Sequence, residues 1–300
     1  MHRIPFLGLL RLLRVRQWTK NLFLFLPVFF AGKLFDTRID VQVLLGFLAF
    51  CMAASAVYAW NDLRDAEQDK LHPEKKNRPI PAGQVQPAEA LGLAGILGSL
   101  ALFLAWKISE TFLGLLGLYL VQNLLYSWRL KHIPIVDVSL VSLGFVLRIL
   151  SGGVLADITV SNWIVLMTFL LALFLGFAKR RDDVMLSLDK KQPTRRVVDG
   201  YNLEFLNMSM VFSAGIVVVS YIMYCLSSEV VDHWQTDQLY LTVFPVLLGM
   251  LRYLQLTLVK NKTTDPTRVL LKDVFIQITI GLWVVMFYLI IYHKKFFQIS

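Results

Sequence analysis

Cysteine is nearly absent from this chain, and histidine is rare. The sequence holds 2 cysteines, and Cys51 and Cys225 each lie within an apolar stretch. Such thiols act as small hydrophobic side chains, so we expect neither a disulfide nor redox chemistry. The isolated His132, His233 and His293 do not have the spacing of metal ligands, and we assign them no role.

Charged residues are also scarce, which excludes water as the main solvent. They make up 17% of the chain, against roughly 25% in an ordinary soluble domain, while 56% of the residues are hydrophobic. Acidic residues are the rarer kind, with 21 against 30 basic residues and a net charge of +9. The basic residues fall between apolar blocks and form no single stripe, a pattern that favours lipid headgroups and phosphorylated ligands over nucleic acid.

Apolar blocks long enough to cross a bilayer, which requires about 20 residues per helix, run from end to end. They predict an all-α integral membrane protein with a single domain over residues 1–300. The nine predicted spans are 21–35, 41–60, 88–106, 111–127, 136–156, 162–178, 208–228, 238–258 and 272–292. Before them, residues 1–20 place arginines among leucines, which predicts an amphipathic helix at the membrane interface that the mature protein retains.

Lysine and arginine predict the orientation of these helices. With a cytoplasmic N-terminus, most basic residues fall in the connections on the cytoplasmic side, as the positive-inside rule requires. Two of those connections are long, 61–87 and 179–207, and we expect the active site there. The sequence therefore predicts a multi-pass protein of the cell (inner) membrane whose functional loops face the cytoplasm.

The densest group of acidic residues follows the second predicted span. If that helix continues past the membrane, Asp62, Asp65 and Asp69 stand at i, i+3 and i+7 on one face, with Asn61 beside them. Like charges on one face repel unless cations neutralise them, and hard oxygen ligands of this kind suit Mg²⁺ bridged to a phosphate. The alternative is a solvated helix end whose carboxylates pair with neighbouring basic side chains.

Basic residues follow these carboxylates at once. Lys75, Lys76 and Arg78 lie in a loop that Pro73 and Pro79 brace. Carboxylates for a metal, followed by cations for phosphate, predict a diphosphate site.

Later spans carry further polar residues at their ends. Tyr126 ends the fourth span and Lys131 follows it, where a belt of aromatic and basic residues at the interface is an equally simple interpretation. Asp137 and Arg148 lie at the edge of or within an apolar span. An unpaired charge there costs about 2.5 to 3.5 kcal/mol on insertion scales, so both side chains should face a polar cavity.

The sixth span ends in Lys179-Arg180-Arg181-Asp182-Asp183. A cytoplasmic anchor explains the three cations without any catalytic role. The two aspartates are less expected there. They would provide a second carboxylate group opposite the first, in which case two metals would clamp one leaving group.

Together these motifs resemble the UbiA-type superfamily of intramembrane transferases. The resemblance is carried by Asn61-Asp62-x-x-Asp65-x-x-x-Asp69, by Arg78-Pro79-x-x-x-Gly83, and by Tyr126 with Lys131. Within that superfamily the chain resembles the polyprenyl-phosphate phosphoribosyltransferases. The segments that carry this narrower resemblance are Arg14-x-Arg16-Gln17-Trp18-x-Lys20-Asn21, His72-Pro73-x-Lys75, Tyr126-Ser127-x-x-Leu130-Lys131, Arg148-x-x-x-Gly152-Gly153, Lys179-Arg180, Arg195 with Tyr201, and Arg252-Tyr253 with Asp265-Pro266 and Asp273. Where the subfamily is expected to have Lys-Arg-x-x-Glu, this chain has Lys179-Arg180-Arg181-Asp182-Asp183, with the shorter Asp183 in place of the glutamate.

The resemblance implies a fold, a reaction and a set of site residues. It implies nine helices around a central cavity that opens to the cytoplasm and laterally to lipid. It implies a magnesium-dependent pentosyltransferase that moves 5-phosphoribose from phosphoribosyl pyrophosphate to a decaprenyl-like polyprenyl phosphate and releases pyrophosphate. The implied catalytic residues are Asp62, Asp65, Asp69, Tyr126 and Lys131, with the three aspartates as metal ligands, and the implied substrate-binding residues are Lys20, Asn21, Asn61, Lys75, Arg78, Arg148, Lys179, Arg180, Asp183, Arg195 and Tyr201.

Two other functions fit parts of the same pattern. A prenyltransferase that moves an isoprenoid from its diphosphate to an aromatic or other acceptor would use the same carboxylates, because both reactions expel pyrophosphate. A transporter without chemistry would explain charges within the membrane, but transporters keep their binding site near the midplane, whereas the polar groups here gather at one face. The sequence does not determine the oligomeric state, and it is compatible with a homo-oligomer.

Overall fold

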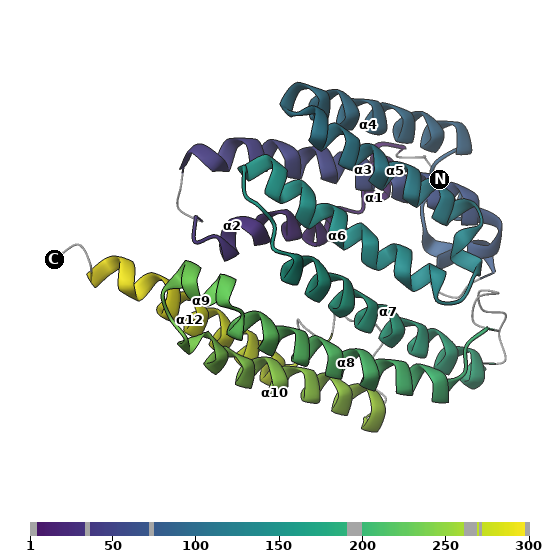
Figure 1. The fold of residues 1–300 in the computed structure, drawn as a ribbon. Coiled ribbons are helices and arrows are strands. Elements are labelled where there is room, and N and C mark those ends of the chain that lie inside the picture. The colour runs from purple at the N-terminus through teal and green to yellow at the C-terminus, as the bar shows by residue number, and fades with distance from the viewer. Residues whose placement is uncertain are drawn as a thin grey trace. The chain divides into compact units, whose positions relative to one another are not determined.

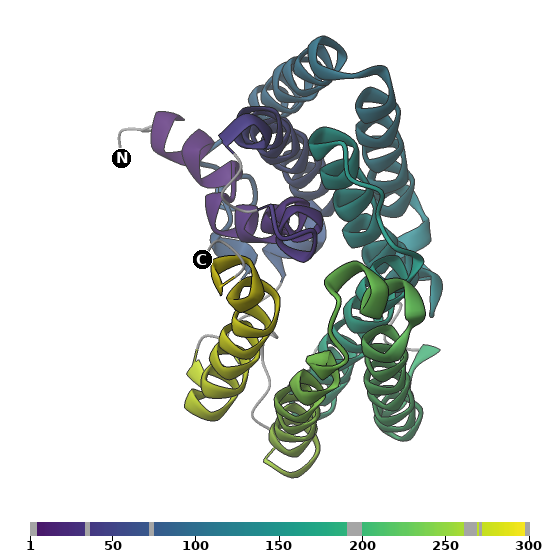
Figure 2. The same ribbon diagram turned by 60° about the vertical axis from the view of Figure 1, so that its left-hand side comes forward.

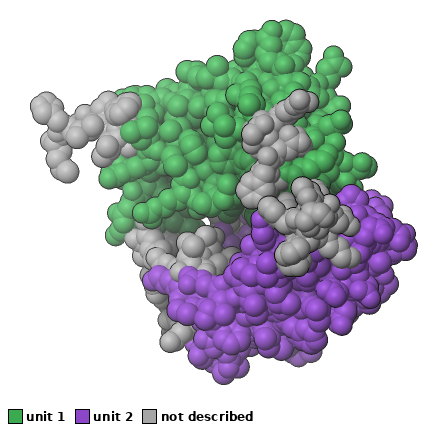
Figure 3. All heavy atoms as spheres, turned by 90° about the vertical axis from the view of Figure 1, so that its left-hand side faces the viewer, with its two compact units in different colours: residues 1–131, 143–160 green, residues 132–142, 161–300 purple. Residues whose placement is uncertain are grey.

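The computed structural model describes residues 5–33, 37–71, 75–190, 200–260, 269 and 272–297. Their regular secondary structure is helical throughout, with no strand in any of these ranges (Figure 1). The chain divides into two compact units, which Figure 3 shows in separate colours. The first unit comprises residues 1–131 and 143–160, and the second comprises residues 132–142 and 161–300.

The first unit is built around the long helix α3. Its elements are α1 (Pro5–Leu12), the 3₁₀ helix η1 (Val15–Phe25), α2 (Leu26–Phe30), α3 (Thr37–Lys70), the 3₁₀ turn η2 (Lys75–Asn77), α4 (Pro87–Ile108), α5 (Glu110–Trp128), the start of η3 (Leu130–His132) and residues 143–156 of α6 (Val136–Ala156). Helix α3 packs against α4, α5 and η1. Its Phe50 is fully buried and lies 5.3 Å from the ring of Tyr119 on α5.

Helices α4 and α5 form a hairpin whose turns are fixed by local capping. At the start of α4, Gln86 and Glu89 form a capping box in which the Glu89 carboxylate accepts the Gln86 N–H at 2.7 Å, and Pro87 takes the first helical position. Ser109 ends α4 in an extended conformation and starts α5 by accepting the Phe112 N–H at 3.4 Å. The two helices lie side by side in both ribbon views (Figures 1 and 2).

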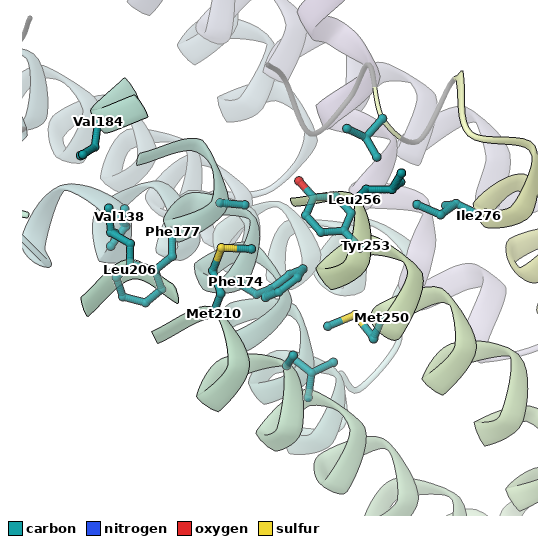
Figure 4. Close-up of a cluster of buried hydrophobic side chains, with 14 of the residues drawn as sticks. Val138, Phe174, Phe177, Val184, Leu206, Met210, Met250, Tyr253, Leu256 and Ile276 are labelled. Carbon is teal, nitrogen blue, oxygen red and sulfur yellow. The ribbon is translucent and has the colours of Figure 1, made fainter. Parts of the chain in front are cut away.

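The second unit is a bundle in which α7 packs on α8 and α10 packs on α12 and α8. Its elements are residues 136–142 of α6, α7 (Asn162–Lys190), α8 (Leu203–Leu226), α9 (Ser228–Trp234), the 3₁₀ turn η5 (Gln238–Thr242), α10 (Val243–Leu254), the π-helical turn η6 (Gln255–Val259) and α12 (Val274–Phe297). The core contains Phe174, Met210 and Tyr253 (Figure 4), and the rings of Phe174 and Tyr253 meet edge to face at 5.2 Å.

Seven of the described helical segments are long and apolar enough to cross a membrane. They are Val41–Lys70, Pro87–Ile108, Val136–Ala156, Asn162–Met185, Leu203–Leu226, Gln238–Val259 and Val274–Ile291. Each overlaps one predicted span. The other two predicted spans, 21–35 and 111–127, fall on η1 with α2 and on α5, which are not among the seven.

The predicted N-terminal helix, residues 1–20, is interrupted in the structure. Helix α1 ends at Leu12, Arg14 adopts the left-handed conformation with φ 48°, and η1 begins at Val15. Leu12 is fully buried. The segment therefore packs into the first unit, and its position at a membrane interface stays a prediction.

Candidate active site

Helix α3 continues past the predicted span to Lys70, so three aspartates share one face. We call Asp62, Asp65 and Asp69 the acidic stripe. Their exposed fractions are 1%, 7% and 5%. A solvated helix end would leave these carboxylates in water, so the burial excludes that alternative for this stripe.

Two arginines neutralise the ends of the acidic stripe. The Oδ1 atom of Asp62 accepts hydrogen bonds from Arg14 Nη2 at 2.5 Å and from Arg78 Nη1 at 3.0 Å. The same Arg78 nitrogen donates to Asp69 Oδ2 at 2.5 Å. The Arg14 guanidinium also lies 5.1 Å from the centre of the Tyr58 ring, a cation–π contact. Arg78 is placed by the η2 turn, where its N–H donates to the Lys75 carbonyl at 2.9 Å.

The central carboxylate pairs with a lysine and an amide. Lys131 on η3 donates to Asp65 Oδ1, and Asn61 Nδ2 donates to Asp65 Oδ2 at 3.3 Å. Since the Asn61 nitrogen must face the carboxylate, its Oδ1 points elsewhere. That oxygen is buried, and among the described residues no donor reaches it. Each carboxylate of the stripe thus has a cationic partner, and one amide oxygen beside it has none.

This donor set fits a hard divalent cation. The described residues contain no complete metal site of three histidine, cysteine, aspartate or glutamate side chains. Mg²⁺ does not need one, because it is commonly bound through one or two carboxylates, water and ligand phosphates. The acidic stripe supplies the carboxylates, and Asn61 Oδ1 supplies a buried oxygen that lacks a partner.

Residues 13–21, which we call the N-terminal strap, run along the same face of α3. Ser55 Oγ donates to the Leu13 carbonyl at 2.8 Å, and Asn21 Nδ2 contacts Cys51 Sγ at 3.3 Å. Cys51 is a buried free thiol, which confirms its predicted role as a small buried side chain. The strap thereby fixes the position from which Arg14 reaches the acidic stripe.

Arg148 is a buried cation with neutral partners. Arg148 lies on α6, and 5% of the residue's surface is exposed. Nε donates to Asn21 Oδ1 at 2.7 Å, Nη1 donates to the Gly144 carbonyl at 2.7 Å, and Nη2 donates to the Tyr119 hydroxyl at 3.0 Å. The guanidinium carbon lies 4.7 Å from the centre of the Tyr119 ring. None of the ion pairs found in the described ranges includes Arg148, so its charge is balanced by no carboxylate there.

In the second unit, Asp137 organises three of the predicted binding residues. Asp137 is fully buried, and its Oδ2 accepts from Arg180 Nε at 2.5 Å while its Oδ1 accepts the Tyr201 hydroxyl at 2.7 Å. Arg180 Nη1 donates to Asp183 Oδ2 at 2.6 Å. The Tyr201 oxygen in turn accepts the Ile135 N–H at 2.5 Å. Burial, ahead of the bond to Asp137, raises the pKa of Tyr201 above its ordinary value, so the hydroxyl stays protonated and can donate.

The other predicted site residues are placed less specifically. Lys20 on the strap, Lys75 on η2 and Tyr126 near the end of α5 are half-buried, and Lys179 on α7 is exposed. Arg195 lies outside the described residues. Asp182 is buried, and a second carboxylate group with its own metal stays a prediction.

Sequence reasoning missed Arg14 as a member of the site. It was one of several arginines in the first 20 residues, and only its place in the Arg14-x-Arg16 motif distinguished it. Its contact with Asp62 joins residues 48 positions apart and depends on the left-handed turn at Arg14 itself.

Comparison with known proteins identifies the family. A model of the UbiA prenyltransferase family matches residues 22–279. The chain belongs to the UbiA prenyltransferase family. It is 31% identical to the decaprenyl-phosphate phosphoribosyltransferase of Mycolicibacterium smegmatis, over 92% of this chain and 90% of that protein. It is also 31% identical to the enzyme of the same name from Corynebacterium glutamicum, over 97% of this chain and 88% of that protein. The resemblance inferred from the motifs is therefore confirmed.

Solved structures of UbiA proteins share the fold. A UbiA homolog from Archaeoglobus fulgidus bound to GPP and Mg²⁺ superposes with a TM-score of 0.69 at 21% identity, covering 95% of this chain and 99% of that one. An apo UbiA homolog from Aeropyrum pernix K1 gives a TM-score of 0.66 at 15% identity, covering 90% and 97%. With this fold and its apolar helices, this UbiA family member is a multi-pass membrane protein.

Proposed function

We propose that this protein transfers 5-phosphoribose from phosphoribosyl pyrophosphate to a polyprenyl phosphate and releases pyrophosphate. The proposal is supported by similarity to two decaprenyl-phosphate phosphoribosyltransferases along nearly the whole chain. Its structural basis is the acidic stripe, in which three buried carboxylates meet Arg14, Arg78 and Lys131. Carboxylates for a metal and cations for phosphate suit a magnesium diphosphate better than a neutral ligand.

We further propose Mg²⁺ as the cofactor, held by Asp62, Asp65 and Asp69 with Asn61 Oδ1 beside them. When bound, the metal neutralises negative charge that develops on the departing pyrophosphate. The related structure from Archaeoglobus fulgidus was solved with Mg²⁺, which supports a divalent ion in this fold.

The side chains around the stripe then orient the diphosphate. Arg78 and Lys131 are close enough to the carboxylates to contact a diphosphate held by the same site. Tyr126 lies near the end of α5, the helix that precedes Lys131. As the bond between C1 of the ribose and the pyrophosphate oxygen breaks, these cations stabilise the charge on the leaving group. Lys20, Lys75, Lys179 and Arg195 are proposed as further phosphate contacts.

Arg148 suits the other phosphate of the reaction. A phosphate that carries a metal needs carboxylates nearby, whereas a phosphate without one needs cations alone. Arg148 has only neutral partners in the described ranges and lies in a membrane-spanning helix, so we assign it, with Asn21, to the lipid phosphate. That phosphate is already an anion, so its oxygen attacks C1 without a general base once it is positioned.

The Asp137 network is proposed to hold in place the predicted binding residues of the second unit. Asp137 accepts hydrogen bonds from Arg180 and Tyr201, and Arg180 also donates to Asp183. We also retain the predicted arrangement of nine helices around a cavity that opens to the cytoplasm and to lipid, with the N-terminus in the cytoplasm.

The test is an assay of the purified protein in nanodiscs with Mg²⁺, phosphoribosyl pyrophosphate and a short polyprenyl phosphate. The expected products are the phosphoribosyl lipid and pyrophosphate in equal amounts, and chelation of the metal should stop both. A parallel reaction with geranyl diphosphate and an aromatic acceptor tests prenyl transfer. Product in that arm alone, or no phosphoribosyl lipid above background, contradicts the proposal.

A further inference from the structure

The carboxylates that the proposed metal needs are occupied by cations of the chain itself. Asp62 Oδ1 accepts from both Arg14 and Arg78, and Asp65 Oδ1 accepts from Lys131. An oxygen that holds two guanidinium donors has no free lone pair for a metal. A divalent ion beside these groups would also repel them, because the site is buried and poorly screened. The metal and these cations therefore compete for the same carboxylates.

Arg14 can be displaced from the acidic stripe. Its φ of 48° places a non-glycine residue in the left-handed region, a conformation that persists only while surrounding contacts hold it. Its side chain is 23% exposed, whereas that of Asp62 is 1% exposed, so the guanidinium can leave toward solvent. The bonds of Ser55 and Cys51 to the N-terminal strap do not involve Arg14, so the strap stays attached when Arg14 moves.

We propose that Arg14 is an exchangeable counter-ion of the metal site, and that Arg78 and Lys131 share this role. Through their ion pairs the three cations neutralise the acidic stripe. When a divalent ion arrives together with a diphosphate, the carboxylates pass to the metal and the cations pass to the diphosphate oxygens. This inference rests on the proposed function, since it assumes that the acidic stripe is the metal site.

Exchange of partners makes the binding of metal and diphosphate cooperative. A metal alone would leave three displaced cations without an anion, and a diphosphate alone would leave its charge beside the carboxylates. Bound together, the two ligands supply a partner for every charge. Each should therefore raise the affinity of the site for the other by the same factor.

The test measures binding of Mn²⁺ as a magnesium substitute by electron paramagnetic resonance. The full-length protein is placed in nanodiscs of zwitterionic lipid, so that the lipid itself binds little metal. Free Mn²⁺ is held at fixed concentrations with and without inorganic pyrophosphate. For the unmodified protein we expect pyrophosphate to raise the Mn²⁺ affinity by about tenfold or more, the effect of ~1.4 kcal/mol.

Arg14→Gln separates counter-ion exchange from a plain structural role. Without the competing guanidinium, this variant should bind Mn²⁺ alone several-fold more tightly, and pyrophosphate should then raise its affinity less. Arg16→Gln is the matched control, because it removes the same charge from an exposed side chain two residues along the strap. It should bind Mn²⁺ as the unmodified protein does.

The outcomes distinguish this inference from the proposed function. If Mn²⁺ fails to bind with or without pyrophosphate, the metal site itself is wrong. If Mn²⁺ binds but Arg14→Gln leaves or lowers its affinity, or Arg16→Gln raises it equally, the exchange is wrong and the metal site stands. Should Arg14→Gln fail to fold, independent binding of Mn²⁺ and pyrophosphate by the unmodified protein overturns the exchange by itself.

Discussion

Gly152 on α6 lies directly against the carbonyl oxygen of Leu24 on η1. A Cβ atom at Gly152 would stand 2.0 Å from that oxygen, far inside any permitted contact. The obstacle is backbone and cannot rotate away. This close approach brings η1, and with it Asn21 of the N-terminal strap, to the part of α6 that carries Arg148.

Gly152→Ala should therefore destabilise the first unit. The added methyl forces the two backbones apart, and overpacking of this kind typically costs about 1–3 kcal/mol. Thermal unfolding of the protein in detergent measures the effect. Gly95→Ala on α4 is the matched control, because no atom lies within 4 Å of a Cβ there, and a helical Gly→Ala change alone should be neutral or stabilising. Equal melting temperatures for the two variants would show that the close approach is absent.

Tyr201→Phe should weaken the second unit. It removes the hydroxyl that donates to Asp137 and accepts from Ile135. The fully buried Asp137 carboxylate then loses one donor, which costs about 1–3 kcal/mol. Tyr240→Phe, at an exposed position, should change the unfolding free energy little. If both variants unfold alike, the Tyr201 hydroxyl does not support the network.

Tyr201 also predicts a dependence of stability on pH. Burial raises its pKa in the folded protein, so the folded state holds this proton more tightly than the unfolded chain does. Its contribution is complete below the unfolded pKa of about 10 and is lost as the pH rises through the higher folded pKa. The free energy of unfolding should fall above about pH 10, and less steeply in Tyr201→Phe. An identical alkaline slope in that variant refutes the linkage.

Arg148→Gln should impair one substrate selectively. Loss of the cation should raise the KM for polyprenyl phosphate and lower kcat/KM by roughly 100-fold, the usual effect of one charged contact to a reacting group, while the KM for phosphoribosyl pyrophosphate stays unchanged. Stability should change little, because removal of a buried cation without a carboxylate offsets the loss of its three hydrogen bonds. Steady-state kinetics with each substrate varied in turn checks this. A KM rise for phosphoribosyl pyrophosphate instead would reassign Arg148.

The sequence predicts features that depend on local periodicity. The acidic stripe follows from the spacing of Asp62, Asp65 and Asp69 if the helix continues past the predicted span, and in the structure α3 runs without a break to Lys70. The family follows from the same motifs. The burial of the stripe could not be read in this way, because it depends on Arg14 and Lys131, which reach it from distant parts of the chain.

Features that depend on tertiary packing lay beyond the sequence. Asp137 and Tyr201 are 64 residues apart, and only the packing of the second unit shows that they share a hydrogen bond. Hydropathy marked 21–35 as a span, but it carries no information on helix type, and the structure has a 3₁₀ helix that leads into the five-residue α2 there. The left-handed turn at Arg14 has no signal of its own, since it is neither glycine nor asparagine.

The central claim is that the acidic stripe holds the metal on which phosphoribosyl transfer depends. Its most direct test is the rate of phosphoribosyl lipid formation as Mg²⁺ is titrated into the unmodified protein, Asp62→Asn and Asp65→Asn. The control is Asp157→Asn, an exposed carboxylate whose left-handed conformation asparagine also adopts. The account predicts full activity for the control and a loss of at least about 100-fold for both stripe variants, with their helical content unchanged. Magnesium-dependent turnover at the unmodified rate in both stripe variants would contradict it.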